Sequence, residues 1–247
     1  SMANAEEYDI AVSAYDYLAK LKNKSSLSAD AYLGYLNVKY LQIVAQIKPD
    51  RAELERLDSL MGASLNEASP KDSYQIILSQ AKIKSYYLNK HSEAIDVFAK
   101  ASSSNKYRQN NYYLKLLLGD IYLLNSNPWD ATLVYAQVEK SNAQPDVVSE
   151  ARFRKAKVAY YIGQFSWAQA QLDVLKAGTS KLISNDALEL SLFISENYDM
   201  DTTETTMRTF ALADLYTFSK QYEKALLCLD SISQKFSNHY LNDGVLY

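Results

Sequence analysis

Apolar residues recur along the chain at the three- and four-residue spacing of amphipathic helices, and the helical runs come in pairs. The second run of each pair carries an alanine with a large apolar residue four positions later, so both lie on one helix face. These alanines are Ala94, Ala131, Ala168 and Ala225. Successive alanines are 37, 37 and 57 residues apart, which indicates a repeating unit with one additional helix in the longest gap.

The first run of each pair is apolar on more than one face. This pattern is typical of a helix packed between its own partner and the next repeat. These runs are residues 74–88, 112–124, 150–162 and 207–218. Only 6 glycines and 4 prolines interrupt the whole chain, too few for a β-protein with many turns. The sequence therefore predicts an all-α protein, a right-handed α-solenoid of stacked antiparallel helix pairs with about a dozen helices.

One pair of runs resembles a tetratricopeptide repeat (TPR), the 34-residue helical hairpin. Residues 112–138 carry its small residue flanked by Leu and Tyr on the first helix, then its alanine and aromatic on the second. These positions are Leu118, Gly119, Tyr122, Ala131 and Tyr135. Residues 149–175 and 206–232 are similar at most of these positions, and residues 78–101 match mainly on the second helix. The resemblance covers residues 70–235 and implies a TPR-like solenoid.

The resemblance divides this single solenoid into parts. We expect degenerate N-terminal helices over residues 1–67, three TPR-like hairpins over 70–177, an extra helix over 182–198 and the last hairpin over 203–235. Residues 240–247 read as the opening of a helix that stops in mid-turn, so we expect a fragment of a longer TPR protein.

Two segments, residues 127–140 and 167–194, resemble parts of long TPR proteins of the bacterial cell envelope. That resemblance implies an exported protein, located in the periplasm or at the periphery of the outer membrane.

Composition limits the partners. The chain has 247 residues, of which 48% are hydrophobic, so it can bury a substantial core. Its 26 basic and 29 acidic residues lack the positive charge typical of nucleic-acid binding, and no nucleic-acid partner is expected. No apolar run approaches the roughly 20 residues of a membrane-spanning helix. The single cysteine, Cys228, excludes an internal disulfide and a cysteine-based metal cluster.

Residues that carry chemistry are few and scattered. The two histidines, His91 and His239, fall in predicted loops, and Cys228 falls on the apolar side of a predicted helix. Trp129 and Trp167 lie beside the repeat alanines, where packing at the hairpin turn is favoured over ligand stacking. No metal-ligand spacing or glycine-rich phosphate loop occurs. We expect no catalytic, cofactor or metal site, and therefore not an enzyme.

The first helices line the concave face of TPR arrays, so the resemblance implies a partner-binding groove on these helices. Its expected lining is aromatic with alternating charge, a composition that binding surfaces favour. The candidate residues are Tyr86, Tyr113, Asp120, Phe153, Lys157, Tyr160, Phe210 and Asp214. Asp120 and Lys157 hold equivalent positions in successive repeats and should project into the same groove. The alternative for each tyrosine is packing between helices.

The Lys and Asn pair with which chaperone-tail-reading TPR domains clamp a terminal carboxylate has no counterpart at the matching positions. That ligand class is not expected. The leading hypothesis is a non-enzymatic scaffold that binds a peptide or protein segment in the concave groove. Two alternatives stay open: a structural spacer or oligomerisation arm, and a regulatory arm of an enzyme outside this fragment.

Overall fold

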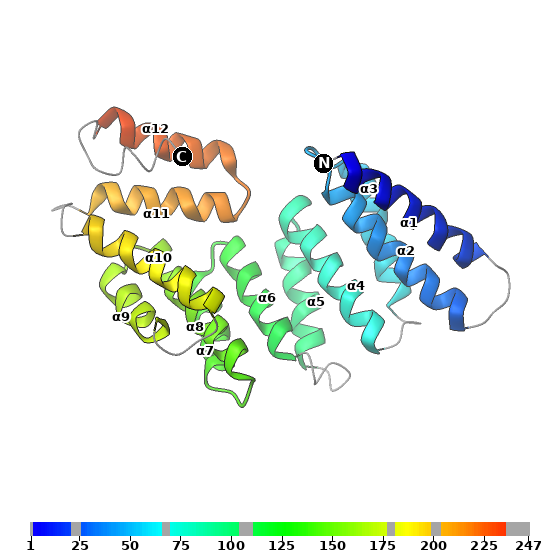
Figure 1. Ribbon diagram of the computed structural model, residues 1–247, viewed down its shortest axis with the longest axis horizontal. Coiled ribbons are helices and arrows are strands. Elements are labelled where there is room, and N and C mark those ends of the chain that lie inside the picture. The colour runs from blue at the N-terminus through cyan, green and yellow to red at the C-terminus, as the bar shows by residue number, and fades with distance from the viewer. Residues whose placement is uncertain are drawn as a thin grey trace. The chain divides into compact units, whose positions relative to one another are not determined.

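The computed structural model describes residues 2–20, 26–65, 70–103, 111–176, 181–198 and 204–235 (Figure 1). Within these ranges the chain forms twelve α-helices and one π-helical segment, and it contains no strand. Successive helices pack against their neighbours, which confirms the predicted all-α helical-repeat fold. The expected helix over residues 240–247 lies outside the described residues.

The elements run in chain order as follows: α1 (Met2–Lys20), α2 (Ser26–Val44), α3 (Arg51–Ser64), α4 (Pro70–Lys82), the π-helix η1 (Ile83–Tyr87), α5 (His91–Ser103), α6 (Asn111–Leu124), α7 (Pro128–Glu139), α8 (Pro145–Tyr161), α9 (Phe165–Leu175), α10 (Lys181–Tyr198), α11 (Thr205–Phe218) and α12 (Tyr222–Lys235). They divide into two compact units, residues 1–114 and 115–247, with the boundary inside α6.

In the first unit, α2 packs against α1, α3 and α4, and α5 packs against α4 and η1. Its core is formed by aliphatic side chains of α2, α3, α4 and η1. The most deeply buried of them are Leu36, Ile43, Leu54, Met61, Ile76 and Ile83. Burial of this apolar area is the main stabilising contribution, because each fully buried aliphatic side chain contributes about 1.5–3 kcal/mol.

In the second unit, α8 pairs with α9 and α11 pairs with α12, while α10 packs on α9 and α8 (Figure 1). α8 also contacts α7 and α11. The repeat alanines Ala131, Ala168 and Ala225 are buried, as expected for close helix contacts. The ring of Tyr135 on α7 covers Gly119 on α6, and a Cβ atom at Gly119 would collide with it. Glycine is therefore required there for the two helices to approach closely.

Four hairpin turns share one backbone conformation. The residue two positions before the second helix has a positive φ: Asn89, Ser126, Gly163 and Lys220, at 57°, 59°, 75° and 56°. The next residue donates its backbone N–H to a carbonyl five residues back in three of these turns, as in a Schellman cap. These bonds are Asn127 to Tyr122, Gln164 to Ala159 and Gln221 to Tyr216, each 2.8 Å long.

The first of the four turns contains one extra residue. Lys90 bonds the carbonyl of Lys84, six residues back, because η1 adds a residue to the preceding helix. The small residues Gly119, Ala156 and Ala213 precede their positive-φ residues by seven positions, whereas the buried Ala81 precedes Asn89 by eight. The first helix over residues 74–88 therefore keeps the repeat pattern, with one inserted residue that the π-helix absorbs.

Candidate functional site

A pocket of about 180 Å³ opens in the second unit on the side of the first helices. Side chains of α6, α7, α8 and α11 line it, and the largest share comes from α8. The lining residues, named here the α8 pocket, are Asp120, Leu123, Tyr135, Glu150, Phe153, Arg154, Lys157, Tyr161 and Phe218. The five from α8 recur on successive helical turns, with Phe153 and Arg154 adjacent in sequence, so they form one continuous stripe of that helix.

A closed polar network supports one wall of the α8 pocket. Tyr135 Oη donates to Asp120 Oδ1 at 2.6 Å, and Arg154 Nη1 donates to Asp120 Oδ2 at 2.6 Å. Arg154 Nε donates to Glu150 Oε1 at 2.7 Å, one helical turn earlier. The network joins α6, α7 and α8 and occupies both oxygens of the buried Asp120 carboxylate.

Burial and the hydrogen-bond partners have opposite effects on the pKa values of Asp120 and Arg154. Burial raises the pKa of the Asp120 carboxyl, and Arg154 and Tyr135 offset only part of that effect. Burial also opposes the charge of Arg154, but Asp120 and Glu150 outweigh it and raise the pKa of the guanidinium. Arg154 is therefore a permanent cation that is already paired with two carboxylates.

Lys157 is the other cation of the pocket and has a different environment. Its Nζ lies 5.8 Å from the ring centre of Phe153 and 5.7 Å from that of Tyr161, both in the range of cation–π contacts. No carboxylate among the described residues lies within 4.0 Å of this ammonium group. The charge of Lys157 helps to lower the pKa of Asp214, although burial raises that pKa more strongly.

Three of the eight candidate groove residues lie together in the α8 pocket. They are Asp120, Phe153 and Lys157. Asp120 and Lys157 line the same pocket, and Asp120 pairs with Arg154 rather than with Lys157. Sequence reasoning missed Arg154 and Glu150, although their four-residue separation on one helix was a readable signal for an ion pair.

Three other candidates lie between α8, α10 and α11 or bond to one another, and the expected groove position is wrong for Tyr160. Tyr160 is 1% exposed, and its Oη donates to Asp214 Oδ2 at 2.7 Å. The ring of Phe210 lies against that of Phe193 of α10, with ring centres 5.0 Å apart, and Tyr160 contacts the same ring. The cause is the extra helix, which adds its own aromatic side chain against α8 and α11. Tyr160 is consequently a core residue.

The last two candidates, Tyr86 and Tyr113, belong to the first unit. Tyr86 is half-buried in η1, and Tyr113 is exposed. The tryptophans also differ from expectation, because Trp129 is 67% exposed and Trp167 is exposed beside Lys155 Nζ. Both lie in the first turn of a second helix, and neither is a buried core residue.

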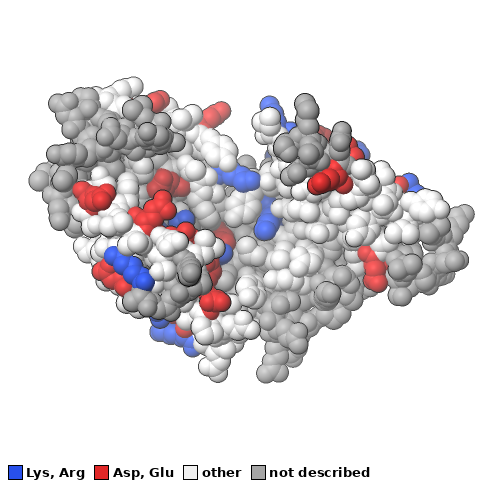
Figure 2. Space-filling view, in the orientation of Figure 1, with Lys and Arg blue, Asp and Glu red and all other residues white. Residues whose placement is uncertain are grey.

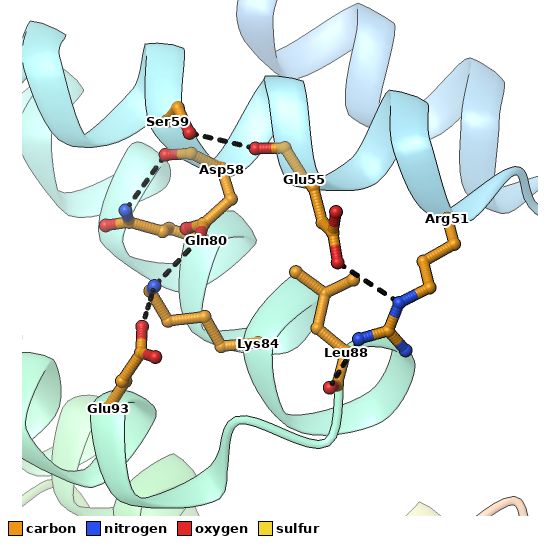
Figure 3. Close-up of polar contacts among 8 residues, drawn as sticks. All are labelled: Arg51, Glu55, Asp58, Ser59, Gln80, Lys84, Leu88 and Glu93. Atoms are coloured by element: carbon orange, nitrogen blue, oxygen red, sulfur yellow. Dashed lines mark hydrogen bonds and ion pairs between the residues drawn. The ribbon is translucent and has the colours of Figure 1, made fainter.

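A second polar centre lies in the first unit around Lys84 (Figure 3). Lys84 belongs to η1 and is 7% exposed, and its Nζ lies 2.7 Å from Asp58 Oδ2 and 2.7 Å from Glu93 Oε2. Gln80 Nε2 donates to the backbone carbonyl of Asp58 at 3.1 Å. The cation thus links α3, η1 and α5 and is fully engaged by carboxylates.

Burial opposes the charge of Lys84, but the hydrogen bonds to Asp58 and Glu93 prevail and raise its pKa. A lysine held in this protonated state is a poor base or nucleophile. At the edge of the same centre, Arg51 pairs with Glu55 and reaches the carbonyl of Leu88 (Figure 3). The arrangement acts as a structural clamp between helices.

Acidic and basic side chains are scattered over a mostly uncharged surface on the face shown in Figure 2. Within the described ranges, no group of three or more His, Cys, Asp or Glu side chains is placed to hold a metal ion. None of the helices in that part of the chain is long and apolar enough to cross a membrane. Comparison of the chain with protein-family models, curated proteins and solved structures finds no match.

Proposed function

We propose that this chain is a non-enzymatic scaffold that binds a peptide or protein segment through the α8 pocket. The observation that carries the proposal is the Lys157 ammonium group, which lies near two aromatic rings of α8 and, among the described residues, has no carboxylate within 4.0 Å. Membership in the TPR family and an exported, envelope-associated location are part of the proposal. They are supported by the 37-residue spacing and by the sequence resemblance.

The size of the pocket favours a side chain over a cofactor as its occupant. A volume of about 180 Å³ corresponds to about six waters at roughly 30 Å³ each. Sites for small molecules and cofactors typically measure about 300–1,000 Å³. The α8 pocket is below that range and suits one or two side chains of a bound segment, with the rest of the segment lying across the helices.

The pocket is also preorganised. The Tyr135–Asp120–Arg154–Glu150 network holds α6, α7 and α8 together through four side chains. Since these groups satisfy one another, ligand binding need not order them, and the entropy cost of association is smaller. Because Asp120, Glu150 and Arg154 bind one another, none of them is available as the general acid or base that an enzymatic reaction would require.

A specific observation favours a second candidate, an oligomerisation arm. The second helices expose large apolar side chains, among them Trp129 and Leu133 on α7 and Leu226 and Leu227 on α12. Exposed apolar side chains on neighbouring turns of a helix are typical of protein interfaces. An oligomer formed through these faces would leave the α8 pocket unused.

The experiment selects random linear peptides on the immobilised full chain and measures the affinity of the enriched peptides in solution. A Phe153→Ala, Lys157→Ala double variant should weaken them at least tenfold, because both substitutions lie in the pocket. A Trp129→Ala, Leu133→Ala variant is the matched control and should bind normally. Circular dichroism melting should show that both variants remain folded.

Two outcomes would contradict the proposal. In the first, no peptide is enriched over a blank surface. In the second, the enriched peptides bind the pocket variant as tightly as wild type. Loss of self-association in the Trp129→Ala, Leu133→Ala variant would support the oligomerisation arm instead.

A further inference from the structure

We infer that the α8 pocket recognises the carboxylate of an acidic side chain inside a polypeptide segment, with an apolar side chain of the same segment beside it. This inference rests on the proposed function and names the chemistry of its partner. Its basis is the difference between the two cations of the pocket, Arg154 and Lys157.

Arg154 is a poorer receptor of a ligand charge than Lys157. Its Nη1 and Nε already donate to Asp120 and Glu150, at 2.6 and 2.7 Å. A guanidinium group has five N–H donors, so Arg154 can still form further hydrogen bonds. The two carboxylates already balance its positive charge, and they repel an incoming anion.

Lys157 retains its capacity to donate. Its ammonium group contacts ring faces, and its charge acts on Asp214, whose carboxylate accepts a hydrogen bond from Tyr160. An ammonium group has three donors, and a ring face satisfies none of them as fully as an oxygen does. A carboxylate oxygen arriving above the rings of Phe153 and Tyr161 would form a charge-assisted hydrogen bond.

The charge balance favours a singly charged ligand group. The pocket contains Asp120, Glu150, Arg154 and Lys157, two acidic and two basic side chains. A phosphate would bring up to two negative charges close to Asp120 and Glu150, and phosphate recognition generally uses a cluster of arginines. A single carboxylate matches Lys157, the cation of the pocket that has no carboxylate within 4.0 Å among the described residues. A terminal carboxylate carries the same charge as an internal acidic side chain, and amidation of the peptide C-terminus distinguishes the two.

The other lining residues explain why we expect an apolar side chain of the segment beside its acidic side chain. Leu123, Phe153, Tyr161 and Phe218 surround Lys157 with hydrocarbon and ring surface. An aliphatic or aromatic side chain packed there would displace water from the ion pair and strengthen it. The recognised element is therefore an acidic residue within one or two positions of an apolar residue.

The test uses random linear peptides selected in parallel on wild type and on a Lys157→Glu variant. Wild type should enrich acidic residues next to apolar ones, and the Lys157→Glu variant should enrich basic residues instead. For one enriched peptide, replacing its acidic side chain by the amide should weaken binding to wild type about tenfold. The same replacement should have no effect on binding to a Lys157→Met variant. Amidation of the peptide C-terminus should change nothing.

Lys224→Met is the matched control, because Lys224 Nζ also lies over a ring, that of Tyr216 at 5.5 Å, but outside the pocket. It should leave binding unchanged. Peptides that depend on Phe153 yet tolerate loss of their acidic group would overturn this inference and leave the scaffold function intact. A dependence on the terminal carboxylate alone would also overturn it. Failure to enrich any peptide would contradict the scaffold function itself.

Discussion

At the scale of single residues, the four hairpin turns depend on a left-handed backbone position that only one of them fills with glycine. Gly163 adopts a φ of 75° without a steric cost, whereas Ser126 and Lys220 adopt the same region with a Cβ atom present. A left-handed conformation costs a residue with a Cβ atom about 1–2 kcal/mol. These turns therefore contain local strain that the Schellman bonds and the packing of the second helices outweigh.

Replacing Ser126 by glycine should stabilise the protein. The strain of about 1–2 kcal/mol is relieved, and the greater flexibility of glycine in the unfolded chain offsets about 0.5–1 kcal/mol. The expected gain is about 0.5 to 1 kcal/mol in the free energy of unfolding, measured with urea. Ser126→Ala keeps the Cβ atom and is the control, with no gain expected. A Ser126→Gly variant no more stable than Ser126→Ala would mean that the turn is unstrained.

The buried tyrosines predict how the free energy of unfolding depends on pH. Burial raises the pKa of Tyr40 to about 12, and burial together with Asp214 raises the pKa of Tyr160 and Tyr161 as well. In the unfolded chain these phenols ionise near their ordinary value of 10.0. Above that pH the unfolded chain loses protons that the folded chain keeps, so stability is complete below about pH 10 and falls as the pH rises.

Urea unfolding from neutral pH to about pH 12 measures this effect, with tyrosinate absorbance recorded in parallel. Tyr40→Phe keeps the ring but cannot ionise, so its stability should fall less steeply above pH 10 than that of wild type. Tyr222→Phe is the control, because Tyr222 is exposed. Equal slopes for Tyr40→Phe and wild type would contradict the prediction.

The sequence predicted the burial of residues whose packing recurs in every repeat. It failed for residues whose neighbours occur in one repeat only. The alanines at 37-residue spacing are buried as expected, because every repeat needs the same close contact between its helices. Tyr160 was misplaced because its neighbour Phe193 comes from α10, which the other repeats lack. Asp120 lines the α8 pocket, but its pairing with Arg154 depends on side-chain reach that sequence spacing does not specify.

At the scale of elements, η1 explains why the first helix of one repeat looked degenerate. An inserted residue rotates the side chains on its far side by about 100° around the helix axis. A sequence comparison at fixed spacing therefore matches on one side of the insertion and fails on the other. In the structure the buried Ala81 corresponds to the small residue of the other repeats, and Lys84 pairs with Asp58 of α3 and Glu93 of α5. π-helical segments occur mostly as short bulges inside α-helices, as η1 does at the end of α4. Here the result is a buried clamp.

The clamp predicts a strong coupling between Lys84 and Asp58. Lys84→Met should cost about 3–5 kcal/mol of unfolding free energy, because it leaves the buried Asp58 carboxylate without its cation. Adding Asp58→Asn to Lys84→Met removes that charge and should recover a large part of the loss. The double-mutant cycle is measured by urea unfolding. Losses that simply add would show that the two groups do not interact.

At the scale of the whole molecule, the chain consists of two compact units that share one helical-repeat plan. The first unit contains the Lys84 clamp, and the second contains the α8 pocket. The lysines of these two polar centres differ in their partners. Lys84 pairs with two carboxylates, whereas Lys157 lies near ring faces and has no carboxylate within 4.0 Å among the described residues. That difference is why we assign partner binding to the second unit.

The central claim is that a protein segment binds on the first helices of the second unit. The most direct measurement is the change in backbone amide NMR signals of the 28.0 kDa chain when a peptide enriched on wild type is added. If the segment binds in the α8 pocket, the largest shifts cluster at residues 120–123 and 150–161 and near Phe218, and Lys157→Met weakens the response. Shifts confined to the exposed faces of α7 and α12, around Trp129 and Leu227, would contradict it.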